Sequence, residues 1–139
     1  MDEPTYVEHE PDAVRFLQTI AAAGELRPGT VLVASTVNGG PGVAIAIDDV
    51  PLDPPQFSRV RAMRQVMDVL EYLGHDGALL AVSRTGQPAI QGGDLAWHDA
   101  FAGMAREHAV AALGVYVVTA QGVRRVRPRQ VVVGYRPAG

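Results

Sequence analysis

The feature that most constrains this fold is an alternation of short apolar runs with segments of helical periodicity, separated by Gly and Pro. Apolar or β-branched runs predict strands over residues 30–37, 43–47, 78–82 and 114–119, with shorter ones over 123–126 and 130–135. Apolar residues three and four apart predict helices that begin near Glu10, Pro55 and Asp94. We expect these helices to end near Gly24, Gly74 and Ala112, with Asp94 as the N-cap of the third.

This order of elements predicts an α/β domain. The Asn-Gly-Gly-Pro-Gly turn at residues 38–42 favours a hairpin between the first two strands. Strands joined through helices usually pair in parallel, through right-handed crossovers. We therefore expect a mixed, mostly parallel sheet with a leading β-hairpin and with helices packed on it in two or three layers.

Composition narrows the class of protein. A chain of 139 residues fits one domain, with residues 1–10 as a flexible acidic N-terminus. The chain is 47% hydrophobic and 19% charged, which is too apolar for a disordered protein. It has no cysteine, which excludes disulfides and thiolate-ligated metals, and no apolar run long enough to cross a membrane. An acidic start without signal-peptide features leads us to expect a cytoplasmic protein. The twelve basic residues are all Arg, as high-GC coding favours.

Charge is polarised between the two ends of the chain. The acidic end holds Asp2, Glu3, Glu8, Glu10 and Asp12, and the basic end holds Arg124, Arg125, Arg127, Arg129 and Arg136. Arg124, Arg125, Arg127 and Arg129 are candidates for weak nucleic-acid binding. Because the net charge is −3, we favour pairing of the two ends or simple solvation, and consider nucleic acid an unlikely partner.

Two resemblances to known families can be traced in the sequence. Leu-Arg-Pro-Gly-Thr at 26–30, then VLVAST, GVAIAIDDVPLDPP, ALLAV and GVYVVTAQGVRRV in order, resembles the actinobacterial domain of unknown function 4192. That resemblance spans most of the chain and implies no activity. The strand, loop and helix around Asp94 also resemble RadC and JAB-type (MPN-fold) metalloproteases. In that pattern the zinc-ligand positions fall on Ala81, Ser83 and Gln91, so the resemblance implies a degenerate domain without its metal.

The strongest candidate for a ligand site is the loop Ser83-Arg84-Thr85-Gly86. It follows a predicted parallel strand, and ligands of open α/β sheets bind outside the carboxyl ends of the strands. Hydroxyls, a guanidinium and a glycine could hold an anion, and Asp48 and Asp94 complete the candidate set. The competing interpretation is an exposed, mobile loop. Ser83 has no His–acid pair at a spacing that would make it a nucleophile.

No metal or cofactor site is predicted. His98 and Asp94 share a face of the third helix, but His108 lies nearly three helical turns from His98. The acidic pair Asp48–Asp49 resembles a receiver-type magnesium site, but the required Lys is absent.

Three functions remain open. We expect a non-catalytic binding or regulatory module that docks a protein partner or a small anion, with a homodimer through the second helix as a further possibility. A hydrolase with a site at the Ser83–Gly86 loop, and nucleic-acid binding through the C-terminal arginines, are the alternatives.

Overall fold

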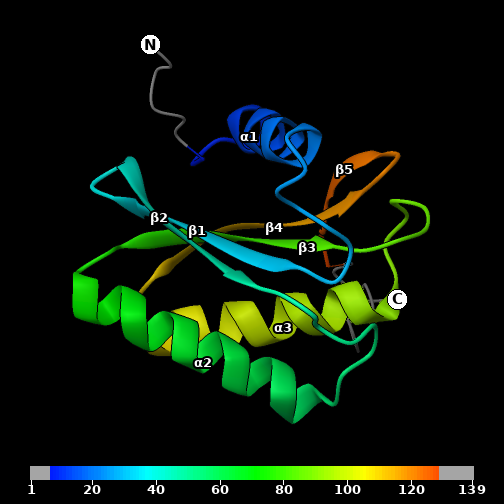
Figure 1. Ribbon diagram of the computed structural model, residues 1–139. Coiled ribbons are helices and arrows are strands. Elements are labelled where there is room, and N and C mark those ends of the chain that lie inside the picture. Colours follow the sequence, from blue (N-terminus) through cyan, green and yellow to red (C-terminus); the bar gives the residue numbers. More distant parts are fainter. Residues whose placement is uncertain (1–6, 129–139) are drawn as a thin grey trace, which may run out of the picture.

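The computed structural model describes residues 7–128. In this part of the chain, three helices and five strands follow in the order α1 (Glu10–Ala22), β1 (Val31–Val37), β2 (Gly40–Ile47), α2 (Gln56–Leu73), β3 (Gly77–Ser83), α3 (Gly92–Glu107), β4 (Ala111–Thr119) and β5 (Gly122–Arg125). Figure 1 shows them around a single mixed sheet. The α/β class predicted from the sequence is confirmed, and no helix in the described range could cross a membrane.

The sheet has the strand order β2-β1-β3-β4-β5, and its pairing corrects the prediction of a mostly parallel sheet. Within the described residues, only β3 and β4 pair in parallel. The pairs β1–β2, β1–β3 and β4–β5 are antiparallel. Since β1 is antiparallel to both its neighbours, β2 and β3 do run in the same direction, as a crossover through α2 requires. The prediction failed because β1, the other arm of the predicted hairpin, lies between them.

The element boundaries differ from the sequence prediction mainly at the end of α3. The helix ends at Glu107, not near Ala112, because Ala109 adopts a left-handed backbone with φ of 55° and β4 already begins at Ala111. The strand predicted over 123–126 is present as β5, whereas the one predicted over 130–135 lies outside the described residues.

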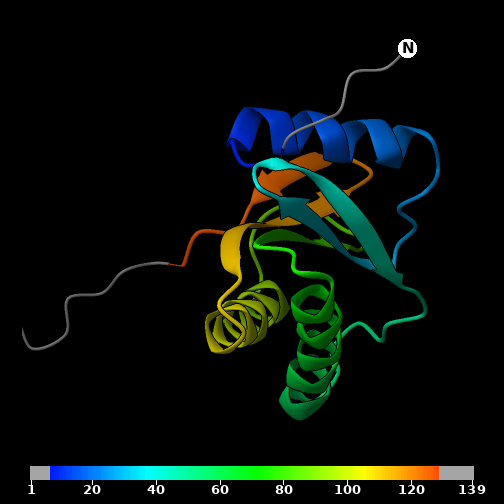
Figure 2. The same ribbon diagram turned by 90° about the vertical axis from the view of Figure 1, so that its left-hand side faces the viewer.

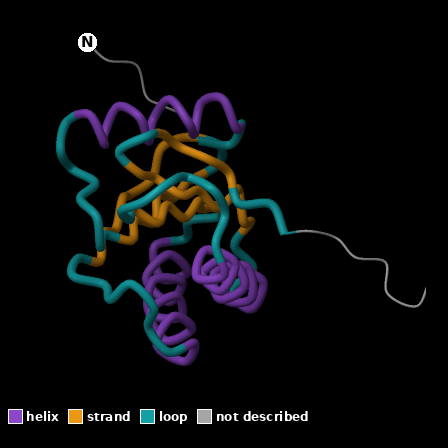
Figure 3. The backbone as a smooth tube through the Cα atoms, turned by 90° about the vertical axis from the view of Figure 1, so that its right-hand side faces the viewer, coloured by secondary structure: helices purple, strands orange, loops and turns teal. Residues whose placement is uncertain are grey.

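Both faces of the sheet are covered by helices, as Figures 1 and 2 show. Every residue of β3 is buried, which agrees with its uninterrupted apolar sequence. On one face, Leu79 and Ala81 of β3 pack with Leu17 of α1. On the other, Leu80 and Val82 belong to the cluster that α2 and α3 form. Figure 3 shows α2 and α3 lying together beneath the sheet.

Val7 is buried in the cluster beneath α1, and Glu10 begins that helix. The described part of the segment 1–10, which the sequence predicts to be flexible, therefore contributes to the core.

Three chain segments meet at the carboxyl end of β3. The Gly29 N–H donates to the Ser83 carbonyl at 2.9 Å, and the Val50 N–H donates to the Gly29 carbonyl at 2.8 Å. Gly29 adopts a φ of 93°, which a side chain would strain. These bonds tie the segment before β1 and the β2–α2 loop to the end of β3, where α3 also begins.

Candidate functional site

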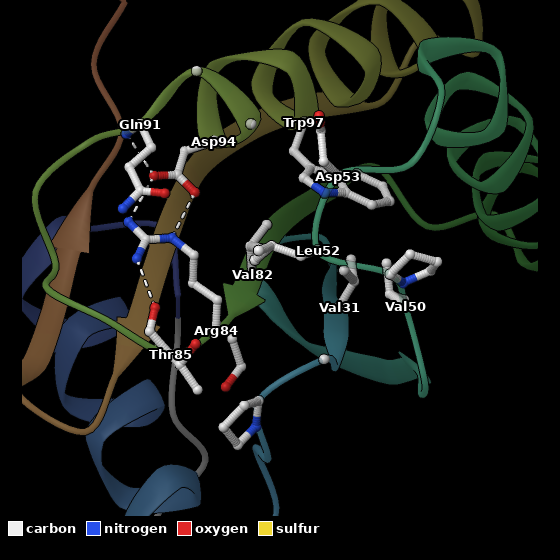
Figure 4. A pocket seen from close by; sticks show the side chains of 16 residues that line it. Val31, Val50, Leu52, Asp53, Val82, Arg84, Thr85, Gln91, Asp94 and Trp97 are labelled. Atoms are coloured by element: carbon white, nitrogen blue, oxygen red, sulfur yellow. Dashed lines mark hydrogen bonds and ion pairs between the residues drawn. The ribbon is translucent and has the colours of Figure 1, made fainter.

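A cavity of about 460 Å³ opens where these segments meet. Its lining comes from the segment before β1, the β2–α2 loop, the end of β3 and the first turns of α3. Figure 4 shows the Arg84–Asp94 pair on one side of this cavity and Trp97 with Asp53 on another. The apolar part of the lining consists of Pro28, Val31, Val50, Pro51, Leu52, Val82 and Trp97.

The cavity includes most of the ligand loop predicted from the sequence. Ser83, Arg84, Thr85 and Asp94 line it, whereas Gly86 and Asp48 do not belong to the lining. Asp48, just after β2, instead accepts a hydrogen bond at 2.9 Å from the hydroxyl of Thr30, just before β1.

Arg84 is held entirely by the protein. Its Nε and Nη2 donate to the two Asp94 carboxylate oxygens at 3.0 and 2.9 Å, in the bidentate geometry that a guanidinium favours. Nη1 donates to the carbonyls of Thr85 and Gln87, and Nη2 also donates to that of Ala89. A guanidinium has five N–H groups, and these five bonds use all of them. Arg84 therefore organises the loop and has no donor left for a ligand.

Asp94 also fixes the start of α3, although the N-cap itself differs from the prediction. Gln91 is the N-cap residue, and Asp94 stands three positions into the helix. The two residues form a capping box, in which the Gln91 N–H donates to the Asp94 carboxylate at 2.8 Å. The prediction of Asp94 as the N-cap was wrong because the glycine pair 92–93 already belongs to the helix.

The backbone at the start of α3 adds open polar groups to the cavity. Gly92 and Gly93 are the first two residues of α3, so no earlier helical carbonyl can accept their N–H groups. The helix dipole favours negative charge at this end. Sequence reasoning missed both glycines because it placed the helix start at Asp94.

A second arginine lies close to the cavity wall and was not singled out from the sequence. Arg59 of α2 is 3% exposed, stacks over the Trp97 ring at 5.5 Å and pairs with Asp53 at 3.1 Å. Its Nε has no hydrogen-bond partner among the described residues. An ideal Cβ on Gly93 would lie 3.4 Å from Arg59 Nη2, so positive charge lies beside the first turn of α3.

The hydroxyl of Ser83 is committed to structure, since it donates to the Leu26 carbonyl at 3.2 Å and the residue is buried. A Ser–His contact does exist at the opposite end of the sheet, where Ser35 Oγ lies 2.7 Å from His75 Nδ1. Ser35 is 4% exposed and also accepts the Val43 N–H at 2.8 Å. This serine fills the irregular pairing of β1 with β2 and is not open to a substrate.

Two of the C-terminal arginines contact the acidic end of the chain. Arg125 Nη1 lies 3.1 Å from the Glu10 carboxylate, and Arg127 pairs with the same carboxylate. Arg124 lines a surface pocket with them, and Arg129 lies outside the described residues. Glu10 thus neutralises part of the candidate nucleic-acid surface.

In comparisons with protein-family models, with curated proteins and with solved structures, no significant match to this chain is found. The resemblances to the domain of unknown function 4192 and to the JAB-type fold stay predictions.

Proposed function

We propose that this protein is a non-catalytic binding module whose ligand is a small organic anion with an apolar body. The observation that carries the proposal is the cavity beside the predicted loop, which combines an apolar lining with the N-terminus of α3. Its volume of about 460 Å³ lies within the range of small-molecule sites.

The two kinds of lining suggest how such a ligand would be oriented. An apolar body would contact Val31, Val82 and Trp97. The anionic group, a carboxylate or a phosphate, would accept hydrogen bonds from the N–H groups of Gly92 and Gly93. Asp53 and Asp94 do not oppose this orientation strongly, because each is paired with an arginine.

Binding is a better proposal than hydrolysis for this site. The described residues that line the cavity include no histidine, and the Ser83 hydroxyl is already bonded to a carbonyl. A nucleophile needs a base within hydrogen-bond reach. The proposal therefore assigns the loop a structural role and the cavity a binding role.

The chain contains its own reporter for the test. Trp97 is the single tryptophan and lines the cavity, so its fluorescence should respond to any occupant. We would titrate phenylacetate, with 2-phenylethanol as the neutral analogue and acetate as the anion without an apolar body. We expect a saturable change with phenylacetate and a weaker response to either control.

A matched pair of variants at Gly92 tests the anion contact. Gly92→Pro removes the N–H at the first helical position, where proline is well tolerated. Gln91 is already extended, with φ −115° and ψ 168°, as a residue before proline should be, and no heavy atom lies within 4 Å of an added Cβ. Gly92→Ala keeps the N–H and serves as the control.

We expect Gly92→Pro to weaken phenylacetate binding about tenfold or more, as the loss of a charged hydrogen bond implies. Gly92→Ala should bind as the native protein does, and binding of 2-phenylethanol should be the same in both variants. Leu52→Ser, at a lining side chain that is 77% exposed, should weaken the binding of acid and alcohol alike. Tyr72→Ser, at a side chain that is 90% exposed and lies outside the lining, should weaken the binding of neither. The proposal fails if no probe gives a saturable change, or if the Gly92 variants do not differ.

A further inference from the structure

We infer that Asp68, Glu71 and His108 form a binding site for a divalent transition metal of the zinc class between α2 and α3. One ligand atom from each residue lies within 4.8 Å of the others. The site is independent of the cavity. His108 follows the last residue of α3, whereas the cavity lies at the first residue of that helix, and the two ends of α3 are about 22 Å apart by helical rise.

The two carboxylates come from one face of α2. Asp68 and Glu71 are three residues apart, so their side chains are neighbours on the helix surface. Their side chains are 64% and 62% exposed, which leaves room for water to complete a coordination shell. His108 approaches from the other helix, just after α3 ends, with a side chain only 11% exposed.

The orientation of His108 suits a metal ligand. Its Nδ1 lies 2.8 Å from the Met104 carbonyl, and because a carbonyl can only accept, Nδ1 carries a proton there. Metal-binding histidines commonly donate their second ring nitrogen to a carbonyl in this way, which fixes the ring and directs the other nitrogen at the metal. Here that other nitrogen, Nε2, faces the two carboxylates.

The distances need little adjustment. His108 Nε2 is 2.7 Å from Asp68 Oδ1 and 3.9 Å from Glu71 Oε2. Ligands of one zinc ion at about 2.0–2.2 Å lie roughly 3–3.6 Å apart in a tetrahedron. The two observed distances bracket this range, and the ligand atoms of Asp68 and Glu71 lie within 4.8 Å of each other. Rotation of the two exposed carboxylates is the adjustment that a bound ion would require.

The donor set selects the kind of ion. One imidazole nitrogen with two carboxylate oxygens is a set typical of zinc and its neighbours, whereas magnesium and calcium prefer oxygen alone. Three protein ligands leave one position for water. A bound ion would link the last two turns of α2 to the residue after α3 and would stabilise the folded state by mass action.

The same three residues without a metal form an ordinary ion pair between His108 and Asp68. Glu71 separates the two interpretations. At 3.9 Å and largely exposed, its carboxylate contributes little to an ion pair but would be a full ligand of a metal. Glu71→Gln should therefore leave the metal-free protein as stable as the native one.

The experiment is a calorimetric titration of the EDTA-treated, dialysed protein with ZnCl₂, with MgCl₂ as the comparison ion. We expect one equivalent of zinc to bind, with a shift of the His108 ring resonances in the NMR spectrum and a higher melting temperature. Asp68→Asn and Glu71→Gln should each weaken zinc binding at least about tenfold. His9→Asn, at an exposed histidine elsewhere, should leave it unchanged.

Three results would overturn the inference: no stoichiometric zinc binding, binding that Glu71→Gln does not weaken, or binding that His9→Asn weakens as much. Because the cavity ligand is tested with organic acids and Gly92 variants, failure of either proposal leaves the other standing.

Discussion

Arg84→Met is the perturbation for which the structure gives the clearest magnitude. The substitution keeps an unbranched side chain that reaches about as far as Arg84 Nε, and it removes all five donors of the guanidinium. The carbonyls of Thr85, Gln87 and Ala89 belong to exposed residues, so water can replace those three bonds. Asp94 is 2% exposed and keeps only the bond from the Gln91 N–H. Removing one partner of a buried pair costs about 3–5 kcal/mol, and we expect a loss of stability in that range.

The assay is urea unfolding followed by Trp97 fluorescence and circular dichroism, within a double-mutant cycle. Asp94→Leu alone should also lower the free energy of unfolding by about 3–5 kcal/mol, with about 1 kcal/mol more for the loss of its capping bond at the start of α3. The double variant leaves no buried charge at this position, and its loss should fall short of the sum by about 2–3 kcal/mol. Additive losses, or a loss below about 1 kcal/mol for Arg84→Met, would refute the view that this pair is a coupled, buried unit.

Further predictions concern the sheet, the ion pair and the core. Gly42→Ala should destabilise the hairpin, because its Cβ would lie against Ser35 Oγ and 2.8 Å from the Ser35 carbonyl oxygen; a urea midpoint equal to the native one would contradict this. In metal-free protein the hydrogen bond to Asp68, and then the Met104 carbonyl, raise the pKa of His108 in the folded state. The stabilisation of the folded protein by this contact is therefore complete below the unfolded-state pKa of His108, about 6.5, and is lost as pH rises through its folded-state pKa. Urea midpoints across this pH range should fall less in Asp68→Asn than in the native protein. Equal falls would argue against the contact between His108 and Asp68. Phe101→Ala, at a fully buried side chain, should cost about 3–5 kcal/mol in the same assay, and a loss near zero would place Phe101 outside the core.

Local sequence signals predicted the elements well, because they depend on neighbours along the chain. The apolar stripe after Pro55 and the glycine at position 74 predicted α2, which the structure confirms as Gln56–Leu73 with Gly74 in a left-handed conformation. The uninterrupted apolar run at 78–82 predicted a strand, which the structure confirms as β3, buried along its whole length.

The sheet pairing could not be predicted in the same way. Nothing local distinguishes a hairpin placed at the edge of a sheet from one whose first arm is inserted between two crossover-linked strands. The packing of β1 against β3 decides this, and residues such as Val31 and Val82 meet only in the folded state. The same limit applied to His108, whose place after α3 follows from the left-handed turn at Ala109.

The candidate loop shows what residue types along a sequence leave open. Ser83, Arg84 and Asp94 looked like ligand groups because they are polar and follow a strand. In the structure their side chains bond to Leu26, to one another and to the loop backbone, which keeps residues 85–91 folded beside the cavity. The groups left open include the apolar side chains and the first N–H groups of α3, and these N–H groups carry no sequence signal beyond Gly92-Gly93. It follows that Arg84→Met should affect ligand binding only through the geometry of the start of α3. Gly92→Pro, in contrast, should weaken ligand binding without lowering the stability of the protein. This separation of effects is the sharpest test of the view that the loop has a structural role and the cavity a binding role.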